Sequence, residues 1–447
     1  MKDKRNELLY SLDGRPPLKS AIPLGLQHVL AMFVGNVTPI IIISNVLKLP
    51  VEQKAFLIQC AMFVAGIVSL IQCYPIGPVG SKLPIIMGTS FGFLPVCIAI
   101  SGKYGLSGVL GAALVGAVFQ VILGFFLKHI RKYFPPLITG IVLFSIALSL
   151  VSTGVKYFAG GVGAPDFGSI ENLMLGSIVL VIVLGLKQFT KGITSMSSIL
   201  IALIIGYIIA VFMGKVDFSS VANTNWVSIP IPFKFGVEFH LDAIVSMGII
   251  FVISTIETVG NTCGIVSGGL GKTATDEQVS GAVVADGVGT VFAAIFNVLP
   301  NTAYSQNVGI ITMTKVINRF SVATGAVFLV LCGLFPKIGA VIALMPASVL
   351  GGAALVMFSM MLVSGINQIT EEPLVGRNAV IFAVSLGIGV GFSLVPDAYK
   401  NLPHMMQMLF EGGVAVSTII AIFLNLILPK DIEINKSKSN TVSNMSK

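Results

Sequence analysis

Charged residues are scarce in this 447-residue sequence. Only 10% of its residues are Asp, Glu, Lys or Arg, against about 25% in an average soluble domain, whereas 55% are hydrophobic. So few charges cannot cover the surface of a soluble fold of this length, which excludes that class. The charges stand in short clusters between apolar runs of roughly 17 to 25 residues, the length of a helix that crosses a bilayer. The sequence therefore predicts an all-α polytopic membrane protein with no soluble domain at either end.

Cysteine is also scarce, and the placing of the five cysteines argues against two kinds of site. They lie inside or at the edge of apolar runs, without CxxC spacing or partnering histidines, at Cys60, Cys73, Cys97, Cys263 and Cys332. We expect them to be packing residues, and we expect no disulfide framework, no metal site and no cofactor. The formal charge of +8 indicates basic cytoplasmic loops rather than a nucleic-acid partner.

The apolar runs, separated by charged or Gly/Pro-rich breaks, predict about fourteen membrane segments. They centre near residues 34, 64, 91, 117, 145, 179, 204, 251, 288, 310, 328, 352, 386 and 420. The first run, from about Ala21 to Leu47, is too long for the core of a cleavable signal peptide. We therefore expect a transmembrane domain over residues 20–429, between a polar N-terminal segment, 1–19, and a short polar tail, 430–447.

Two of these segments, near residues 83–98 and 302–317, are poor continuous helices. Each starts with an extended-looking stretch that a proline interrupts or opens, at Pro84 in the first and at Pro300 in the second. They are the third and the tenth segment, so they hold matching places in two halves that would be inverted repeats, approximately 20–213 and 242–429. Such a pair indicates a carrier with its site near the midplane, because irregular backbone persists in a membrane only where protein or a water-filled cavity surrounds it.

The basic residues predict the orientation of the chain. If both termini are cytoplasmic, most Lys and Arg residues lie on cytoplasmic loops, as the positive-inside rule requires. The loop residues concerned are Lys82, Lys128, Arg131, Lys132, Lys187, Lys191, Lys272, Lys315, Arg319 and Arg377. We expect a multi-pass protein of the cytoplasmic membrane with both ends inside.

Few ionisable residues lie well inside the predicted spans: His28 in the first, Glu257 in the eighth and Asp286 in the ninth. A charge at the centre of a membrane helix costs about 2.5–3.5 kcal/mol on insertion scales, so each is a candidate functional group. The alternative is a packing role, in which the side chain bonds to backbone or bridges two helices. That alternative is strongest for His28.

Polar residues beside Glu257 and after the two interrupted stretches complete the candidate site. Gly260 and Asn261 follow Glu257 by about one helical turn, so the three share a face, and the glycine would admit a neighbouring backbone. A carboxylate that accepts from ring N–H groups, beside an amide that donates and accepts, suits a flat heterocycle. The helices that open after the interrupted stretches would offer N–H groups to carbonyl oxygens of the substrate. Their first residues include Gln306 and Asn307 in one half and Ser90 in the other.

The segment from Gln306 to Lys315 resembles the signature of the nucleobase–ascorbate transporter family, (Gln/Glu/Pro)-Asn-x-Gly-x-x-x-x-Thr-(Arg/Lys/Gly). The pair Gln27-His28, Glu257 and the run Ala285-Asp286-Gly287 are similar to that family too, and the resemblance extends from about Ala21 to Leu428. It implies a fourteen-span fold of two inverted seven-span repeats, divided into a core and a gate domain and often dimeric. In that fold the third and tenth spans each contain a short strand.

The resemblance also assigns roles to individual residues. It implies that Glu257 and Gln306 hold the base, that Asp286 takes part in proton coupling, and that His28 supports the site through hydrogen bonds. The candidate substrate-binding residues are Glu257, Gln306, Ser90, Asn307, Gly309 and Asn261. The candidate proton-coupling residues are Asp286, Glu257 and His28.

Gln306 resembles the xanthine and uric acid branch, because uracil carriers usually have Glu at this position. The run Glu257-Thr258-Val259-Gly260 also resembles that branch, because uracil carriers tend to have His directly after the Glu. Asn261 and Lys315 depart from the purine pattern, in which Asp and Gly are common.

The expected function is proton-coupled uptake of a purine base, xanthine or uric acid. A uracil–proton symporter is the alternative, and sodium coupling stays open. More distant are an anion carrier, which usually adds a soluble C-terminal domain, a channel, and a membrane-embedded enzyme, for which no HExxH or GxSxG pattern is present.

Overall fold

The computed structural model of the chain describes residues 8, 10–127, 135–222, 224–403, 406–407, 410 and 413–429. Within these residues nine helices are long and apolar enough to cross a membrane, or ten spans if the bent pair Arg319–Gly333 and Pro336–Ala343, which meet at 81°, counts as one. The prediction of a helical, multi-pass membrane protein is confirmed. Lys128, Arg131 and Lys132, the tail 430–447 and residues 1–7 and 9 of the N-terminal segment lie outside the described residues.

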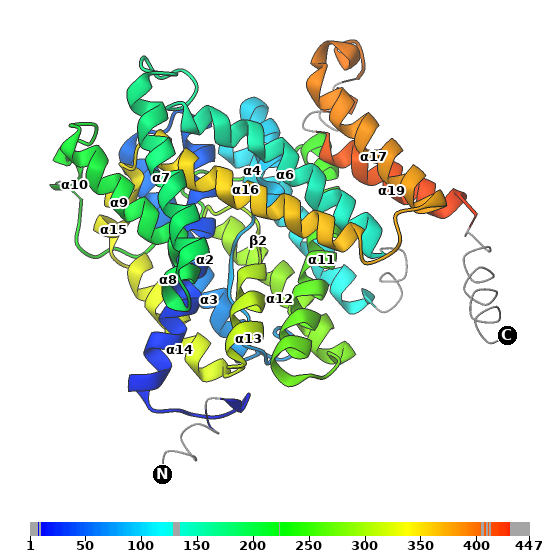
Figure 1. Ribbon diagram of the computed structural model, residues 1–447, viewed down its shortest axis with the longest axis horizontal. Coiled ribbons are helices and arrows are strands. Elements are labelled where there is room, and N and C mark those ends of the chain that lie inside the picture. Colours follow the sequence, from blue (N-terminus) through cyan, green and yellow to red (C-terminus); the bar gives the residue numbers. More distant parts are fainter. Residues whose placement is uncertain are drawn as a thin grey trace.

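The first half of the chain runs from blue to green in Figure 1. Its elements are α2 (Leu18–Val46), α3 (Val51–Cys73), β1 (Met87–Thr89), the 3-10 turn η1 (Phe91–Phe93), α4 (Leu94–Phe125), α6 (Pro136–Phe158), α7 (Ile170–Phe189), α8 (Ile193–Met196) and α9 (Ser198–Phe212). Helix α4 joins the helical part of the predicted third segment to the predicted fourth. The junction is a kink at Gly105, whose φ of 66° is a conformation that glycine adopts without strain.

The second half follows a short linker helix, α10 (Ser219–Ala222). Its elements are α11 (Leu241–Leu270), α12 (Asp276–Ile295), β2 (Asn301–Ala303), α13 (Ser305–Thr314), α14 (Arg319–Gly333), α15 (Pro336–Ala343), α16 (Ala347–Ile369), α17 (Gly376–Leu394), η3 (Pro396–Tyr399) and α19 (Val414–Ile427). Every predicted segment centre lies in a helix or, at residue 91, in η1. The predicted number of segments is larger than nine or ten partly because α9, α13 and α19, with 15, 10 and 14 residues, are shorter than a helix that spans the bilayer alone.

The two interrupted stretches meet at the centre of the molecule as an antiparallel pair of strands. The paired residues are Met87 with Ala303, Gly88 with Thr302 and Thr89 with Asn301. Backbone hydrogen bonds from Ser90 to Pro300, at 2.9 Å, and from Tyr304 to Ile86, at 3.1 Å, extend the pairing at both ends. All six strand residues are buried. The backbone groups that leave the helical pattern are therefore satisfied inside the protein, as a membrane requires.

Side chains of four long helices hold the two strands in corresponding ways. The first N–H of each strand donates to a hydroxyl group, from Met87 to Ser69 Oγ of α3 at 2.8 Å and from Asn301 to Thr290 Oγ1 of α12 at 3.0 Å. The third residue of each strand bonds to an Asn amide, with Thr89 N donating to Asn36 Oδ1 of α2 at 2.8 Å and Asn261 Nδ2 of α11 donating to Ala303 O at 2.9 Å. Thus α3 corresponds to α12, and α2 to α11, in how they hold the strands.

The helices pack in two groups. The first surrounds the strands, with α4 against α11 and α12, and α14 against α2 and α3. The second comprises α6, α7, α9, α16, α17 and α19, and its centre is the packing of α16 on α6. Glycines allow that close packing, since a Cβ at Gly351 would lie 2.0 Å from the Phe158 nitrogen and one at Gly140 would lie 2.7 Å from the Ile369 nitrogen. In Figure 1, α17 and α19 stand at one end of the molecule, apart from the strands.

Candidate functional site

Glu257 lies on α11, beside the paired strands, and its side chain is half-buried. It makes no hydrogen bond or ion pair with any residue that the structure describes. Its carboxylate is close enough to the Asp286 carboxyl and to the Tyr304 hydroxyl for their charges to interact. A carboxylate placed in a membrane helix without a protein partner is available to a ligand.

Open space adjoins both Glu257 and Gln306. A Cβ at Gly260 or at Gly309, each three residues after one of these polar side chains, would meet no atom within 4 Å. The expectation that Gly260 admits a neighbouring backbone is therefore wrong, because α13 packs on α11 further along. There a Cβ at Gly264 would lie 2.7 Å from Val308 and one at Gly268 would lie 2.3 Å from Thr312. Glu257 and Gln306 thus lie before the contact between α11 and α13 and take no part in it.

Asp286 on α12 is fully buried. Its Oδ2 atom accepts hydrogen bonds from Thr258 Oγ1, from Gln120 Nε2 at 3.3 Å and from Thr302 Oγ1 at 3.4 Å. Its Oδ1 atom has no hydrogen-bond partner among the described residues. The hydrogen bonds therefore gather on one oxygen and leave the other available to carry a proton. Thr258, whose hydroxyl donates to Asp286, directly follows Glu257 in the chain.

Gln306 and Asn307 lie in the first turn of α13, as the sequence predicts, but their side chains point to different surroundings. Gln306 is exposed and has no side-chain hydrogen bond to a described residue. Asn307 is buried, and its Nδ2 atom donates to the Pro84 carbonyl oxygen at 2.5 Å. His28 of α2 is buried beside the Asn307 amide. Asn307 therefore ties α13 to the first interrupted stretch, with His28 of α2 beside it, while Gln306 stays open to a ligand.

Ser90 and Asn261 are occupied with backbone. The Ser90 hydroxyl accepts from the Gly92 nitrogen at 3.1 Å and so caps η1, in agreement with the expectation that Ser90 stands at a helix start. Asn261, expected beside Glu257 in a notch for the substrate, uses its Nδ2 atom to hold β2. These bonds leave the O–H group of Ser90, and the second N–H and the carbonyl oxygen of the Asn261 amide, as the groups that the two residues can offer to a substrate.

Several residues of this region were not predicted from the sequence. Thr258, Thr302 and Gln120 surround Asp286, Asn36 holds β1, and the Tyr304 hydroxyl donates to the Thr89 carbonyl oxygen at 2.6 Å. Asn36 and Gln120 are uncharged polar residues inside apolar runs. That signal could have found them, because such residues in membrane helices usually bond to a neighbouring element.

The cysteines contribute no site. Cys60, Cys73, Cys97 and Cys332 are buried, Cys263 is half-buried, and none of the five forms a disulfide with a described residue. In the described part of the chain no group of three or more His, Cys, Asp or Glu side chains is placed to hold a metal ion. The polar centre of the molecule is thus built from carboxyl, amide and hydroxyl groups.

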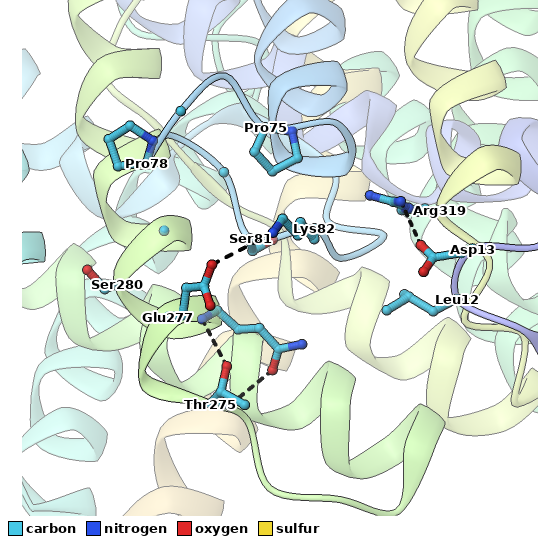
Figure 2. A pocket seen from close by; sticks show the side chains of 14 residues that line it. Leu12, Asp13, Pro75, Pro78, Ser81, Lys82, Thr275, Glu277, Ser280 and Arg319 are labelled. Atoms are coloured by element: carbon cyan, nitrogen blue, oxygen red, sulfur yellow. Dashed lines mark hydrogen bonds and ion pairs between the residues drawn. The ribbon is translucent and has the colours of Figure 1, made fainter.

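A second polar region lies away from the strands, where the N-terminal segment meets the start of α14. A pocket of about 390 Å³ opens there between the ion pairs Asp13–Arg319, at 2.6 Å, and Lys82–Glu277, at 3.7 Å (Figure 2). Behind it the buried Asn318 caps α14 and donates through Nδ2 to the carbonyl oxygens of Leu8, Ser11 and Gly14 at 3.1, 2.9 and 2.8 Å. One amide thus fixes the N-terminal segment to the first helix group.

Asn318→Ala is expected to lower the stability of the purified protein by about 1–3 kcal/mol, because a buried cap and three carbonyl acceptors lose their partner at once. The melting temperature in detergent measures the effect. Asn378→Ala is the matched control, since that amide donates to Glu372 and to the Pro373 carbonyl at the surface and should change little. Equal melting temperatures for the two variants would contradict the role given to Asn318.

Paired interrupted spans that meet at the centre of a helical membrane protein, next to one buried and one half-buried carboxyl group, are typical of a secondary transporter. A murine Slc26a9 anion transporter structure in the inward-facing state has the same fold, with a TM-score of 0.61, 14% sequence identity, and coverage of 90% of this chain and 68% of that one. The family model Xan_ur_permease, described as a permease family, matches residues 19–398. Xanthine permease XanQ of Escherichia coli K12 is 37% identical over 95% of this chain and 94% of its own, and uric acid permease PucJ of Bacillus subtilis is 35% identical over 90% and 91%. The chain belongs to this permease family, the nucleobase–ascorbate transporters.

Proposed function

We propose that the protein is a proton-coupled symporter that takes up a purine base, xanthine or uric acid, across the cytoplasmic membrane. The observation that carries the proposal is the half-buried Glu257 carboxylate, which has no partner among the described residues and stands beside the open space at Gly260. The names of the relatives XanQ and PucJ give the substrate class. A xanthine or uric acid ring carries several N–H groups and several carbonyl oxygens, so it needs both an acceptor and donors.

Glu257 and the start of α13 supply these complementary groups. The carboxylate accepts from ring N–H groups, and the Gln306 amide both donates and accepts. Helix α13 begins after Tyr304 without a side-chain cap, and the Asn307 N–H donates to the Tyr304 carbonyl oxygen, so the N–H groups of Ser305 and Gln306 are the ones that can donate to a substrate carbonyl oxygen. Ser90, Asn307, Gly309 and Asn261 complete the binding region, Gly309 by leaving room and the others by fixing the backbone around it.

Proton coupling belongs, in this proposal, to Asp286 with Glu257 and His28. Protonation of Asp286 at its unpartnered Oδ1 atom neutralises a fully buried carboxyl and favours the substrate-bound state. Because the Asp286 and Glu257 carboxyl groups are close enough to interact electrostatically, the change in charge at Asp286 acts directly on the binding carboxylate. The loaded first helix group then moves against the second, and the proton leaves on the cytoplasmic side.

The architecture that we propose has fourteen spans in two inverted repeats, approximately 20–213 and 242–429, with a core and a gate domain. Support comes from the corresponding strand contacts of Ser69 and Thr290 and of Asn36 and Asn261. The first helix group would be the core and the second the gate. The distribution of basic residues supports cytoplasmic termini, and membership of the family suggests a homodimer.

A uracil symporter is the second candidate, because Asn261 and Lys315 depart from the purine pattern. Both departures concern backbone contacts. Asn261 holds Ala303, and Lys315 ends α13 with a φ of 58°, in the left-handed region that glycine adopts without strain, and its Nζ atom donates to the Gly268 carbonyl oxygen at 2.9 Å. Neither departure removes a group that would bind the purine ring, and this favours a purine over uracil as the substrate.

Uptake of labelled xanthine by cells that lack their own base carriers tests the proposal. Excess unlabelled uric acid and an uncoupler should each block uptake, whereas excess uracil should not. Replacing external sodium with choline should have no effect. Uptake of uracil without uptake of xanthine would transfer the assignment to the pyrimidine branch, and loss of uptake in choline would replace the proton with sodium.

A further inference from the structure

An apolar groove of about 670 Å³ runs along α2, α3 and α14 on the first helix group. Leu18, Ile22 and Leu26 of α2 form one side, and Val327, Phe328 and Leu331 of α14 form the other. Most of these side chains are exposed, including Ile22 at 45%, Val327 at 46% and Leu331 at 49%. Since α2 and α3 are each long and apolar enough to cross a membrane, and α14 is so together with α15, we infer that the groove faces the acyl chains of the bilayer.

The depth and length of the groove follow from the crossing of α2 and α14. A Cβ at Gly25 would lie 2.3 Å from the Ser321 carbonyl oxygen, and one at Gly325 would lie 2.4 Å from the Gly25 carbonyl oxygen. The two backbones therefore touch at the floor, and the longer side chains on both sides stand out as walls. From Leu18 to Leu26 the groove follows α2 for about 12 Å, at 1.5 Å per residue, which accommodates a large part of one acyl chain.

The mouth of the groove carries positive charge that makes no ion pair with an acidic side chain in the described part of the chain. Arg15 lines the groove and Lys19 lies in the first turn of α2, which holds no acidic residue. Both side chains are exposed, and neither makes an ion pair with a described residue. Asp13, the nearest acid in the sequence, pairs with Arg319 instead (Figure 2). Among the described residues no Asp or Glu lines the groove.

Tyr74 adds the polar–apolar boundary that a lipid requires. Its ring lines the groove at the same end as Arg15, and the Arg319 guanidinium lies 5.0 Å from the ring centre. Tyrosine is enriched where a membrane changes from hydrocarbon to headgroup, because its ring is apolar and its hydroxyl polar. The groove therefore has an apolar length, then an interfacial aromatic ring, and then the Arg15 cation, with Lys19 next to the groove residue Leu18 in the chain.

We propose that this groove binds one anionic phospholipid, with the phosphate of the headgroup against Arg15 and Lys19 and an acyl chain along Ile22, Leu26 and Val327. The charge selects an anionic lipid over a zwitterionic one, since a juxtamembrane cation attracts anionic headgroups. The lipid would bind the helix group that holds the strands. The proposal does not depend on which substrate is carried.

Native mass spectrometry of the full chain tests this proposal, after detergent exchange into a fixed ratio of phosphatidylglycerol and phosphatidylcholine. The wild type should retain one phosphatidylglycerol in preference to phosphatidylcholine. Arg15→Gln should weaken this binding about fivefold, and Arg15→Gln with Lys19→Gln about 25-fold, because each cation contributes a similar increment. Val327→Trp should fill the groove and reduce the retention of both lipids.

Lys272→Gln is the matched control, because Lys272 is an exposed lysine at the turn between α11 and α12 and does not line the groove. It should retain lipid as the wild type does. Melting temperatures of all variants establish that they are folded. Equal retention of the two lipids by the wild type, or equal losses in Lys272→Gln and Arg15→Gln, would overturn the proposal. Retention unchanged by Val327→Trp would overturn the placing of the acyl chain in the groove.

Discussion

Replacing Glu257 with Gln is expected to weaken xanthine binding by at least about 100-fold, the loss that follows when two charge-assisted hydrogen bonds of about 1.5–3 kcal/mol each become a neutral, partly mismatched pair. Gln has nearly the shape of Glu, but its Nε2 atom donates where the ring N–H groups need an acceptor. Equilibrium binding of labelled xanthine to purified protein in detergent measures the change directly, without any requirement for transport.

The matched control for this variant is Glu171→Gln. Glu171 is exposed and pairs with Lys215 at 3.1 Å, so the same chemical change there should leave xanthine affinity as it is. A Glu257→Gln protein that binds xanthine with wild-type affinity would show that the carboxylate does not contact the substrate. The role of substrate acceptor would then have to pass to another group.

Asp286→Asn is expected to lose concentrative uptake while it keeps the exchange of internal for external xanthine. The amide can occupy the same space and keep hydrogen bonds to its neighbours, but it cannot take up and release a proton. Without proton release the carrier only equilibrates its substrate, so internal xanthine should not rise above the external concentration. Proteoliposomes with an imposed proton gradient measure accumulation, and preloaded vesicles measure exchange.

Asp276→Asn is the control for this second variant, because it makes the same change on the same helix at an exposed position. That variant should accumulate xanthine normally. Accumulation by Asp286→Asn at the wild-type level would refute the coupling role of Asp286. Loss of exchange together with accumulation would assign Asp286 to the structure of the site instead.

The sequence was informative where a residue conflicts with its surroundings. Glu257 and Asp286 could be picked out because a carboxyl group is costly in an apolar run, and Pro84 and Pro300 because they interrupt helices. Pairing between distant segments gave no local signal. Gln120 and Asp286 are 166 residues apart in the chain, and Asn36 and Thr89 are 53 apart, so nothing near either residue indicated its partner.

Other features depended on geometry that a pattern of residue types does not contain. The Asn261 amide has hydrogen-bonding groups that suit a ligand as well as a strand. Only the position of Ala303 determines that the amide holds β2. Gly260 could admit a backbone or leave space, and the neighbours of α11 determine that it leaves space. Helix α15 was not expected, because a short apolar helix after a bend of 81° has the composition of a continued span.

Proton movement driven by the substrate alone is the sharpest test of proton coupling in this protein. Purified protein is reconstituted in vesicles that contain a pH-sensitive dye, without an imposed gradient and with choline in place of sodium, and xanthine is added outside. The account predicts that the lumen becomes more acidic when xanthine is added, and that Asp286→Asn abolishes this signal. Entry of labelled xanthine without acidification, or entry only when sodium is restored, would contradict a proton-coupled purine symporter.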